Sequence, residues 1–159
     1  MECEPYKTDL GLGWVVAEDD DLVEIILPGG GEPQGAAAEG GPRTRSLAEQ
    51  LTQYYSGALE WLPHYELCEK AGNTPLQREI YRVVSAIRPG DTMSYGEVAA
   101  AAGRPKAARA VGTAMARNPF PPIIPCHRVV ASNGGLGGYA GGLDMKRQML
   151  TMEREQGRG

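Results

Sequence analysis

The stretch Pro125-Cys126-His127-Arg128 carries the residue types best suited to chemistry in this 159-residue chain. A thiol reacts as its thiolate, and a neighbouring base or positive charge raises the thiolate fraction at neutral pH. The backbone around the cysteine is restricted because four prolines fall within seven residues, at Pro119, Pro121, Pro122 and Pro125. A rigidly held nucleophile is one interpretation. A buried cysteine that packs as a small apolar side chain is the other, and these residues alone do not decide between them.

The charge of the chain is divided unevenly between its two halves. The net charge is -4, but residues 1–87 hold 6 Lys/Arg against 15 Asp/Glu (-9), and residues 88–159 hold 10 against 5 (+5). A phosphate backbone senses the local field, so the basic half is compatible with nucleic-acid binding. An acidic half that only keeps the chain soluble explains the same numbers. Charge alone therefore favours this simpler interpretation over DNA binding.

The three cysteines, Cys3, Cys68 and Cys126, form an odd and sparse set that argues against a disulfide scaffold and for a reducing compartment. No apolar run approaches a membrane span, and the first residues show no targeting pattern. We therefore expect a cytoplasmic protein, nucleoid-associated if prokaryotic, with no membrane partner. Cys3, His64 and Cys68 lack the paired Cys-x-x-Cys or His-x-x-x-His spacing of a metal site, so no metal is predicted.

The sequence of the acidic half predicts few helices and strands. The β-rich runs at residues 12–17 and 22–27 predict a hairpin, and the glycine-rich stretch 29–41 predicts a loop. A Ser and a Glu in capping-box spacing predict an amphipathic helix over residues 46–57. Residues 58–73 are interpreted as a linker.

The basic half is predicted to be mostly helical. A Thr-Pro start and helical spacing of apolar residues predict a helix over residues 74–88, and a second capping box predicts a short helix over 94–103. A third helix is expected over 106–117 and a last one over 143–155. The pair 94–103 and 106–117, joined by a tight glycine-containing connection, predicts a helix-turn-helix.

The second helix of this pair combines tiny side chains with positive charge: Ala107, Ala108, Ala110, Gly112, Ala114 and Ala116, with Lys106, Arg109 and Arg117. Tight helix packing is one explanation. A recognition helix in the major groove usually carries long polar side chains that reach base edges, and this helix lacks them. A smooth basic helix instead suits the minor groove, which is only about 6 Å wide.

Five motifs in a fixed order surround the Cys-His pair: TMSYGEVA at 92–99, RPKAARAVG at 104–112, RNP at 117–119, IIPCHRVV at 123–130 and GGYAGGL at 137–143. With these motifs the sequence resembles the O6-alkylguanine-DNA alkyltransferase family, the methylated-DNA–protein-cysteine methyltransferases. The similarity runs from Thr74 to Glu153 and is loose over residues 1–73.

The resemblance implies an α+β fold with two domains. Residues 1–70 would form a small sheet-plus-helix domain of the ribonuclease-H-like kind, and residues 71–159 a mostly helical domain with a winged-helix-like helix-turn-helix. The implied activity is transfer of an alkyl group from O6-alkylguanine, and less readily O4-alkylthymine, in double-stranded DNA to Cys126. The base is flipped from the minor-groove side, and each molecule acts once. No cofactor is implied, and we expect a monomer.

The resemblance also implies a role for each residue that could act in the transfer. Cys126 would accept the alkyl group, His127 would take the thiol proton through a water molecule, and Glu153 would orient His127. Asn118 would tie the helix-turn-helix to the active-site loop, and Tyr95 would donate to N3 of guanine. The simpler alternatives are a turn-starting role for Asn118, packing for Tyr95 and a surface position for Glu153.

Arg109 would occupy the space left by the flipped base, although a plain phosphate contact is the simpler alternative. The other DNA-binding residues implied are Lys106, Ala107, Ala108 and Arg117. The lesion pocket implied comprises Tyr95, Val129 through its carbonyl, Tyr139, Ala140 and Pro121. Ala140 stands where some members have a serine, so a contact to the lesion oxygen there would have to come from a backbone N–H.

Two other function classes compete with alkyl transfer. A lesion-sensing DNA-binding protein of the same fold is disfavoured because such relatives lack the acceptor cysteine, whereas Cys126 is present. A thiol hydrolase with a Cys126–His127 dyad would leave the predicted helix-turn-helix unused.

Overall fold

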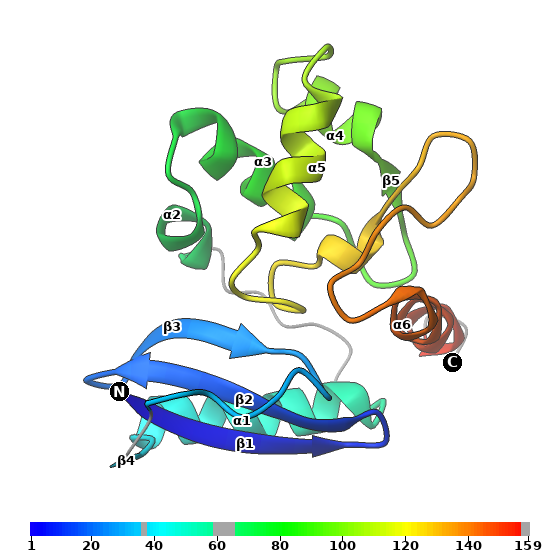
Figure 1. The fold of residues 1–159 in the computed structure, drawn as a ribbon. Helices are drawn as coiled ribbons and strands as arrows, with labels where there is room; N and C mark the ends of the chain where they lie inside the picture. The colour runs from blue at the N-terminus through cyan, green and yellow to red at the C-terminus, as the bar shows by residue number, and fades with distance from the viewer. Residues whose placement is uncertain (36–37, 59–65, 157–159) are drawn as a thin grey trace. The chain divides into compact units, whose positions relative to one another are not determined.

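The computed structural model describes residues 1–35, 38–58 and 66–156 of the chain. The chain divides into two compact units, Met1–Leu62 and Pro63–Gly159 (Figure 1). A small sheet with one helix makes up the first unit and helices dominate the second, so the predicted α+β class is confirmed. None of the helices in the described ranges is long and apolar enough to cross a lipid bilayer.

The first unit is a four-stranded sheet in the order β3-β2-β1-β4, with one helix packed on it (Figure 1). Its elements are β1 (Glu2–Thr8), β2 (Gly11–Glu18), β3 (Asp21–Ile26), β4 (Ala38–Glu39) and α1 (Pro42–Tyr55). The predicted hairpin is confirmed as the antiparallel pair β2 and β3. β1 was not predicted, because Tyr6 is the only buried residue of its seven and the strand shows no apolar alternation. β4 lies in the stretch predicted as a loop and pairs in parallel with β1.

The start of α1 differs from the prediction at Ser46, because the helix begins at Pro42. Its N-cap residue is Gly41, which has no side chain that could cap the helix. The Asp20 carboxylate does so from the β2–β3 turn, where it accepts hydrogen bonds from the backbone N–H groups of Arg43 (3.0 Å) and Thr44 (2.9 Å). These N–H groups have no partner inside the helix. A cap supplied from 23 residues away leaves no local sequence signal.

The second unit contains four longer helices and several short elements. They are α2 (Leu67–Ala71), α3 (Pro75–Ser85), β5 (Met93–Ser94), α4 (Tyr95–Ala101), α5 (Ala108–Ala116), the 3-10 turn η1 (Cys126–Arg128), β6 (Val129–Val130) and α6 (Leu143–Gln156). α2 lies in the stretch interpreted as linker and packs on α3. The predicted domain boundary between residues 70 and 71 therefore falls inside α2, whereas the compact units divide at 62 and 63.

The helix starts predicted from capping residues are confirmed in this unit. Thr74 accepts from the N–H of Gln77 at 3.1 Å, and Ser94 and Glu97 form a complete capping box at the start of α4. α4 and α5 pack together across a turn that contains Gly103 at φ +83°, as in the predicted helix-turn-helix. α5 starts at Ala108 rather than Lys106, because the chain first makes a turn in which Ala107 N–H donates to Arg104 O at 2.9 Å.

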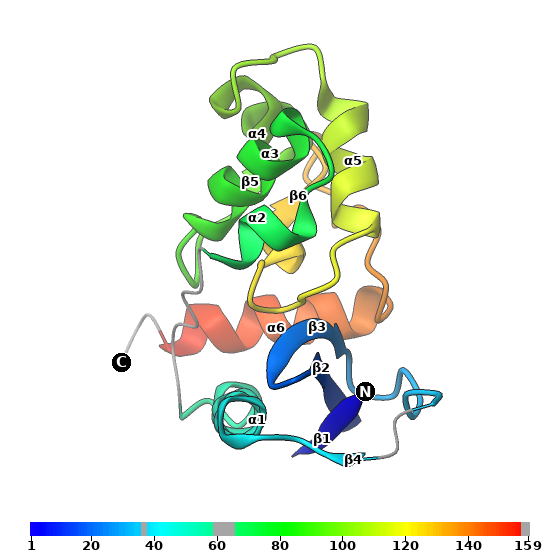
Figure 2. The ribbon, with the colours of Figure 1, turned by 90° about the vertical axis from the view of Figure 1, so that its left-hand side faces the viewer.

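Parallel pairing of β5 and β6 brings distant parts of the second unit together. Met93 pairs with Val129 and Ser94 with Val130. Since Tyr95 follows β5 directly and the Cys126 turn precedes β6, this pairing places the start of α4 beside the cysteine. α6 packs against η1 from another direction (Figure 2). Segments 93–95, 126–130 and α6 therefore converge on one site.

Candidate active site

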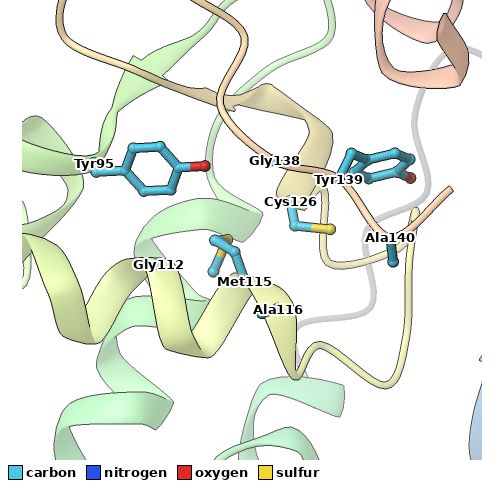
Figure 3. Close-up of a pocket in the computed structure, with 8 residues that line it drawn as sticks. All are labelled: Tyr95, Gly112, Met115, Ala116, Cys126, Gly138, Tyr139 and Ala140. Carbon is cyan, nitrogen blue, oxygen red and sulfur yellow. The ribbon is translucent and has the colours of Figure 1, made fainter. Parts of the chain in front are cut away.

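Cys126 opens into a cavity of about 400 Å³ inside the second unit. Figure 3 shows the eight residues that line it, drawn from the start of α4, from α5, from η1 and from the segment before α6: Tyr95, Gly112, Met115, Ala116, Cys126, Gly138, Tyr139 and Ala140. Cys126 is only 8% exposed. The cavity has the size of an ordinary small-molecule site, so a flat ring system can enter it and reach the sulfur.

His127, Arg128 and Glu153 form a buried hydrogen-bonded group beside the cysteine. His127 Nε2 lies 2.8 Å from Glu153 Oε2, and both side chains are 0% exposed. Arg128 donates to the same carboxylate twice, from Nε at 2.9 Å and from an Nη at 2.7 Å, and its other Nη donates to Ile87 O at 2.7 Å. A buried carboxylate is costly unless charged and polar partners surround it, and here they do.

The electrostatics of this group favour a neutral imidazole next to a carboxylate. Burial alone would raise the pKa of Glu153, but His127 and Arg128 outweigh it and hold this pKa well below its usual range. Burial lowers the pKa of His127 against the opposing attraction of Glu153. Burial also raises the pKa of the Cys126 thiol, while a hydrogen bond from Asn118 and the charge of Lys146 act in the other direction. At rest the site therefore holds a thiol, a neutral base and an ionised acid.

Asn118 joins the end of α5 to the segment that leads into Cys126. Its side-chain Nδ2 donates to Ile124 O at 2.7 Å, and its Oδ1 accepts from the N–H of Phe120 at 3.0 Å. These bonds fold the proline-rich stretch back on itself. Asn118 thus bonds to the segment that leads from α5 to the cysteine, and its implied role in the active site stays a prediction.

The structure divides the residues expected in the lesion pocket into two groups. Tyr95, Tyr139 and Ala140 line the cavity. Pro121 and Val129 are buried and do not appear among the lining residues, and the Val129 carbonyl accepts a hydrogen bond from Lys146 Nζ at 2.7 Å. The roles that the resemblance implies for Pro121 and for the Val129 carbonyl stay predictions.

Gly137 fits closely against Tyr95 at the edge of the cavity. It has φ +72°, and a Cβ added there would lie 2.5 Å from the Tyr95 hydroxyl oxygen. Both the backbone conformation and the contact exclude a larger residue. The contact also holds the Tyr95 phenol in place at one side of the cavity.

The residues expected to contact DNA lie on and around α5. Lys106, Arg109 and Arg117 are exposed, while Ala107 and Ala108 are half-buried at the start of the helix. The same helix contributes Gly112, Met115 and Ala116 to the cavity. One short helix therefore carries both the basic surface and part of the wall around Cys126.

Two buried basic residues of the site, Arg128 and Lys146, were not predicted. Arg128 belongs to the motif around the Cys-His pair, but the sequence predicted no role for its side chain. Lys146 lies seven residues before Glu153 and so shares the buried face of α6 with Met149, Leu150 and Glu153. A lysine at helical spacing on an otherwise apolar face was the signal that could have revealed it.

The prediction of no metal concerned Cys3, His64 and Cys68. His64 lies outside the described residues. Within the ranges that the structure describes, no group of three or more His, Cys, Asp or Glu side chains is arranged to hold a metal ion.

Comparisons with known proteins agree with this geometry. The family model described as 6-O-methylguanine DNA methyltransferase, DNA binding domain, matches residues 75–155. The methylated-DNA–protein-cysteine methyltransferase of Salmonella typhimurium strain LT2 is 36% identical over 162 residues, 94% of each chain. That of Mycolicibacterium paratuberculosis is 40% identical over 156 residues, 97% of this chain and 93% of the relative.

Solved structures give the same result. The crystal structure of Mycobacterium tuberculosis OGT in complex with DNA matches with a TM-score of 0.81 and 28% identity, over 98% of this chain and 94% of that one. The family model covers more than half of the chain, and the relatives match almost all of it. This chain, with Cys126 in the lining of its cavity, is thus a member of the methylated-DNA–protein-cysteine methyltransferase family.

Proposed function

We propose that the chain transfers the alkyl group of O6-alkylguanine, and less readily of O4-alkylthymine, from double-stranded DNA to its own Cys126. The observation that carries the proposal is the thiol in the lining of a cavity, next in sequence to a buried neutral imidazole that is hydrogen-bonded to an ionised carboxylate. The family membership and the OGT–DNA complex support DNA as the substrate.

The hydrogen bond between His127 and Glu153 supports a proposed route for the thiol proton. Because the Glu153 carboxylate accepts from Nε2 of His127, the basic lone pair of the ring is on Nδ1. In the proposed step, Nδ1 takes the Cys126 proton through a water molecule, and Glu153 stabilises the imidazolium. The sulfur then forms a bond to the alkyl carbon while the bond from this carbon to guanine O6 breaks.

The leaving guanine must receive a proton as negative charge develops on it. In the proposal Tyr95, which lines the cavity close to Gly137, donates toward N3 of the base. A contact to O6 would come from a backbone N–H near Ala140. The Val129 carbonyl already accepts from Lys146, so a bond from the guanine amino group would use its second lone pair. The thioether product cannot be reversed by a base, so each molecule acts once.

A base inside the stack cannot reach the cavity unless it is flipped, at a cost of a few kcal/mol. In the proposal α5 lies in the minor groove and Arg109 fills the vacated position, with Lys106 and Arg117 on phosphates. We also propose that the first unit has a ribonuclease-H-like fold and that the helix-turn-helix of the second unit is winged-helix-like.

Replacement of Arg109 tests the flipping role. We expect Arg109→Ala to slow repair of a duplex lesion about 10- to 100-fold, because the few kcal/mol of flipping cost are no longer offset. Reaction with the free base O6-benzylguanine needs no flipping and stays within about twofold. Arg88→Ala, which removes an exposed positive charge outside the helix-turn-helix, is the matched control. Equal losses of rate with the duplex and with the free base would show that Arg109 has no role in base flipping.

The stoichiometry of repair tests the proposal as a whole. Duplex DNA with one O6-methylguanine is incubated with increasing amounts of protein, and the nucleosides are quantified after digestion. We expect one lesion restored to guanine per protein molecule, with no further repair at longer times. Tight lesion binding without restoration would instead identify a sensor. Hydrolysis of a thioester probe by unmodified protein would identify a thiol hydrolase.

A further inference from the structure

Lys146 is a fully buried lysine whose charge the proposed transfer does not use. It lies in the first turn of α6 and is 0% exposed. Its ammonium donates to three backbone carbonyls: Val129 at 2.7 Å, Gly138 at 3.1 Å, and Leu136. A buried ammonium persists only where such acceptors replace its hydration, so this arrangement is specific rather than incidental.

The three carbonyls belong to two segments on different sides of the site. Val129 is the first residue of β6, directly after the Cys126 turn. Leu136 and Gly138 flank Gly137, and Gly138 itself lines the cavity. One ammonium therefore links β6, the strand that follows the Cys126 turn, to the segment 136–138, which we call the cavity wall.

The number of acceptors indicates the protonated form of the amine. An ammonium has three N–H donors and a neutral amine has two, so three carbonyls can be satisfied together only by the charged group. Burial lowers the pKa of Lys146 to about 8, and the nearby Cys126 opposes this shift. The group is thus mostly charged at neutral pH.

Two ionisable groups interact directly with this charge, and two more are linked to them. Cys126 and His127 both interact with Lys146, whose charge lowers the pKa of each. His127 is joined in turn to Glu153, which also binds Arg128. The Lys146 charge favours the thiolate and disfavours a second positive charge on the imidazole.

The wall segment has a second attachment to α6. The Tyr139 hydroxyl donates to Met149 Sδ at 3.5 Å, and its ring lies edge-on to the His127 ring with centroids 6.4 Å apart. This contact is weak compared with the two charge-assisted hydrogen bonds that Lys146 donates to Leu136 and Gly138. Lys146 is therefore the main polar attachment of segment 136–138 to α6 among the contacts described above.

We propose that Lys146 is a positioning residue: its ammonium holds residues 136–138 against β6 and thereby fixes the width of the substrate cavity next to Cys126. The inference rests on the proposed function, since it concerns how that cavity accepts a base. It assigns to α6 a role in substrate fit as well as the placement of Glu153.

The test compares two reagents on Lys146→Met, Lys146→Arg and the wild-type chain. Iodoacetamide is small and reports the reactivity of the thiol, followed by mass on the peptide that contains Cys126. Free O6-benzylguanine must also fit the cavity. Hydrogen exchange at the amides of residues 136–138 reports the attachment of the wall directly. Arg147→Met, which removes the exposed neighbouring charge on α6, is the control and should match wild type.

We expect Lys146→Met to react about tenfold more slowly with iodoacetamide at pH 7, as the thiolate loses its neighbouring charge. Reaction with O6-benzylguanine should fall about 100-fold, because a wall displaced by about 1 Å costs that much in rate. The wall amides should exchange faster. Lys146→Arg keeps the charge but not the shape, so its iodoacetamide rate should stay near wild type while the base reaction falls.

Equal losses with both reagents, or unchanged exchange at 136–138, would overturn the positioning role. A wild-type chain that fails to react with O6-benzylguanine would count against the proposed function, and hydrogen exchange would then still decide whether Lys146 holds the wall. Lys146→Arg serves the same comparison if Lys146→Met does not fold.

Discussion

We expect Cys126→Ala to abolish alkyl transfer and to leave binding of lesion-containing duplex within about 0.5 kcal/mol of wild type, about twofold in Kd. The sulfur is the proposed acceptor, and no other described cysteine lines the cavity. The small change from thiol to methyl at a buried site leaves α5 and its basic residues in place. Restoration of guanine measures transfer, and fluorescence anisotropy with labelled duplex measures binding.

Cys3→Ser is the matched control for this prediction. Cys3 is a free thiol of the first unit and should be dispensable, so its loss leaves stoichiometric repair intact. Repair that survives in Cys126→Ala would contradict the assignment of the acceptor. Loss of DNA binding together with transfer would mean that the variant had lost its fold rather than its nucleophile.

Glu153→Gln is expected to have the second largest effect, on rate and stability together. Without the carboxylate the His127 imidazolium is no longer stabilised, and general-base assistance of this kind is worth about 10²- to 10⁴-fold in rate. Arg128 also loses at least one of its two bonds to residue 153 and becomes a buried charge without its counterion, which costs about 3–5 kcal/mol of stability. Single-turnover kinetics and denaturant unfolding measure the two effects.

A double variant separates the two effects. Glu153→Gln with Arg128→Met removes both charges, so much of the stability should return while the transfer rate stays low. A rate restored along with stability would show that Glu153 acts only by supporting the fold.

Unfolding in acid gives a second check. The pKa of Glu153 is depressed in the folded state, so its contribution to the free energy of unfolding is present above the ordinary value of 4.5 and is lost as the pH falls below it. Glu153→Gln should lack this loss.

The parts of the fold that local sequence determines were predictable. Thr74 and the Ser94–Glu97 capping box mark their helices correctly because each cap bonds to backbone within three residues. The start of α1 could not be found this way, since its capping carboxylate, Asp20, comes from a hairpin turn. β1 gave no signal because its partners, not its own pattern, make it a strand.

The candidate site divides along the same line. The Cys-His pair is a local motif, and its surroundings could be read from the flanking motifs. The burial of Lys146 and the bonds of Arg128 to Glu153 depend on how α6 docks against η1, which local sequence does not specify. Docking of this kind also decides that the Val129 carbonyl accepts a hydrogen bond from Lys146, which the local sequence does not reveal.

Buried charge is concentrated where the chemistry is proposed. Arg128, Lys146 and Glu153 are almost completely buried in one unit and are all within two contacts of Cys126 or His127. Such groups are expensive in a protein interior and are rarely retained for stability alone. Their position is consistent with a site that keeps a thiol protonated until a substrate enters and then removes the proton.

The most direct measurement is the mass of the peptide that contains Cys126 after folded, reduced protein meets excess duplex with O6-methylguanine. Our account predicts that this peptide gains the mass of one methyl group, that peptides with Cys3 and Cys68 gain none, and that unmodified duplex produces no change. A Cys126 peptide of unaltered mass after prolonged exposure, from protein that is still folded and binds the lesion, would contradict it.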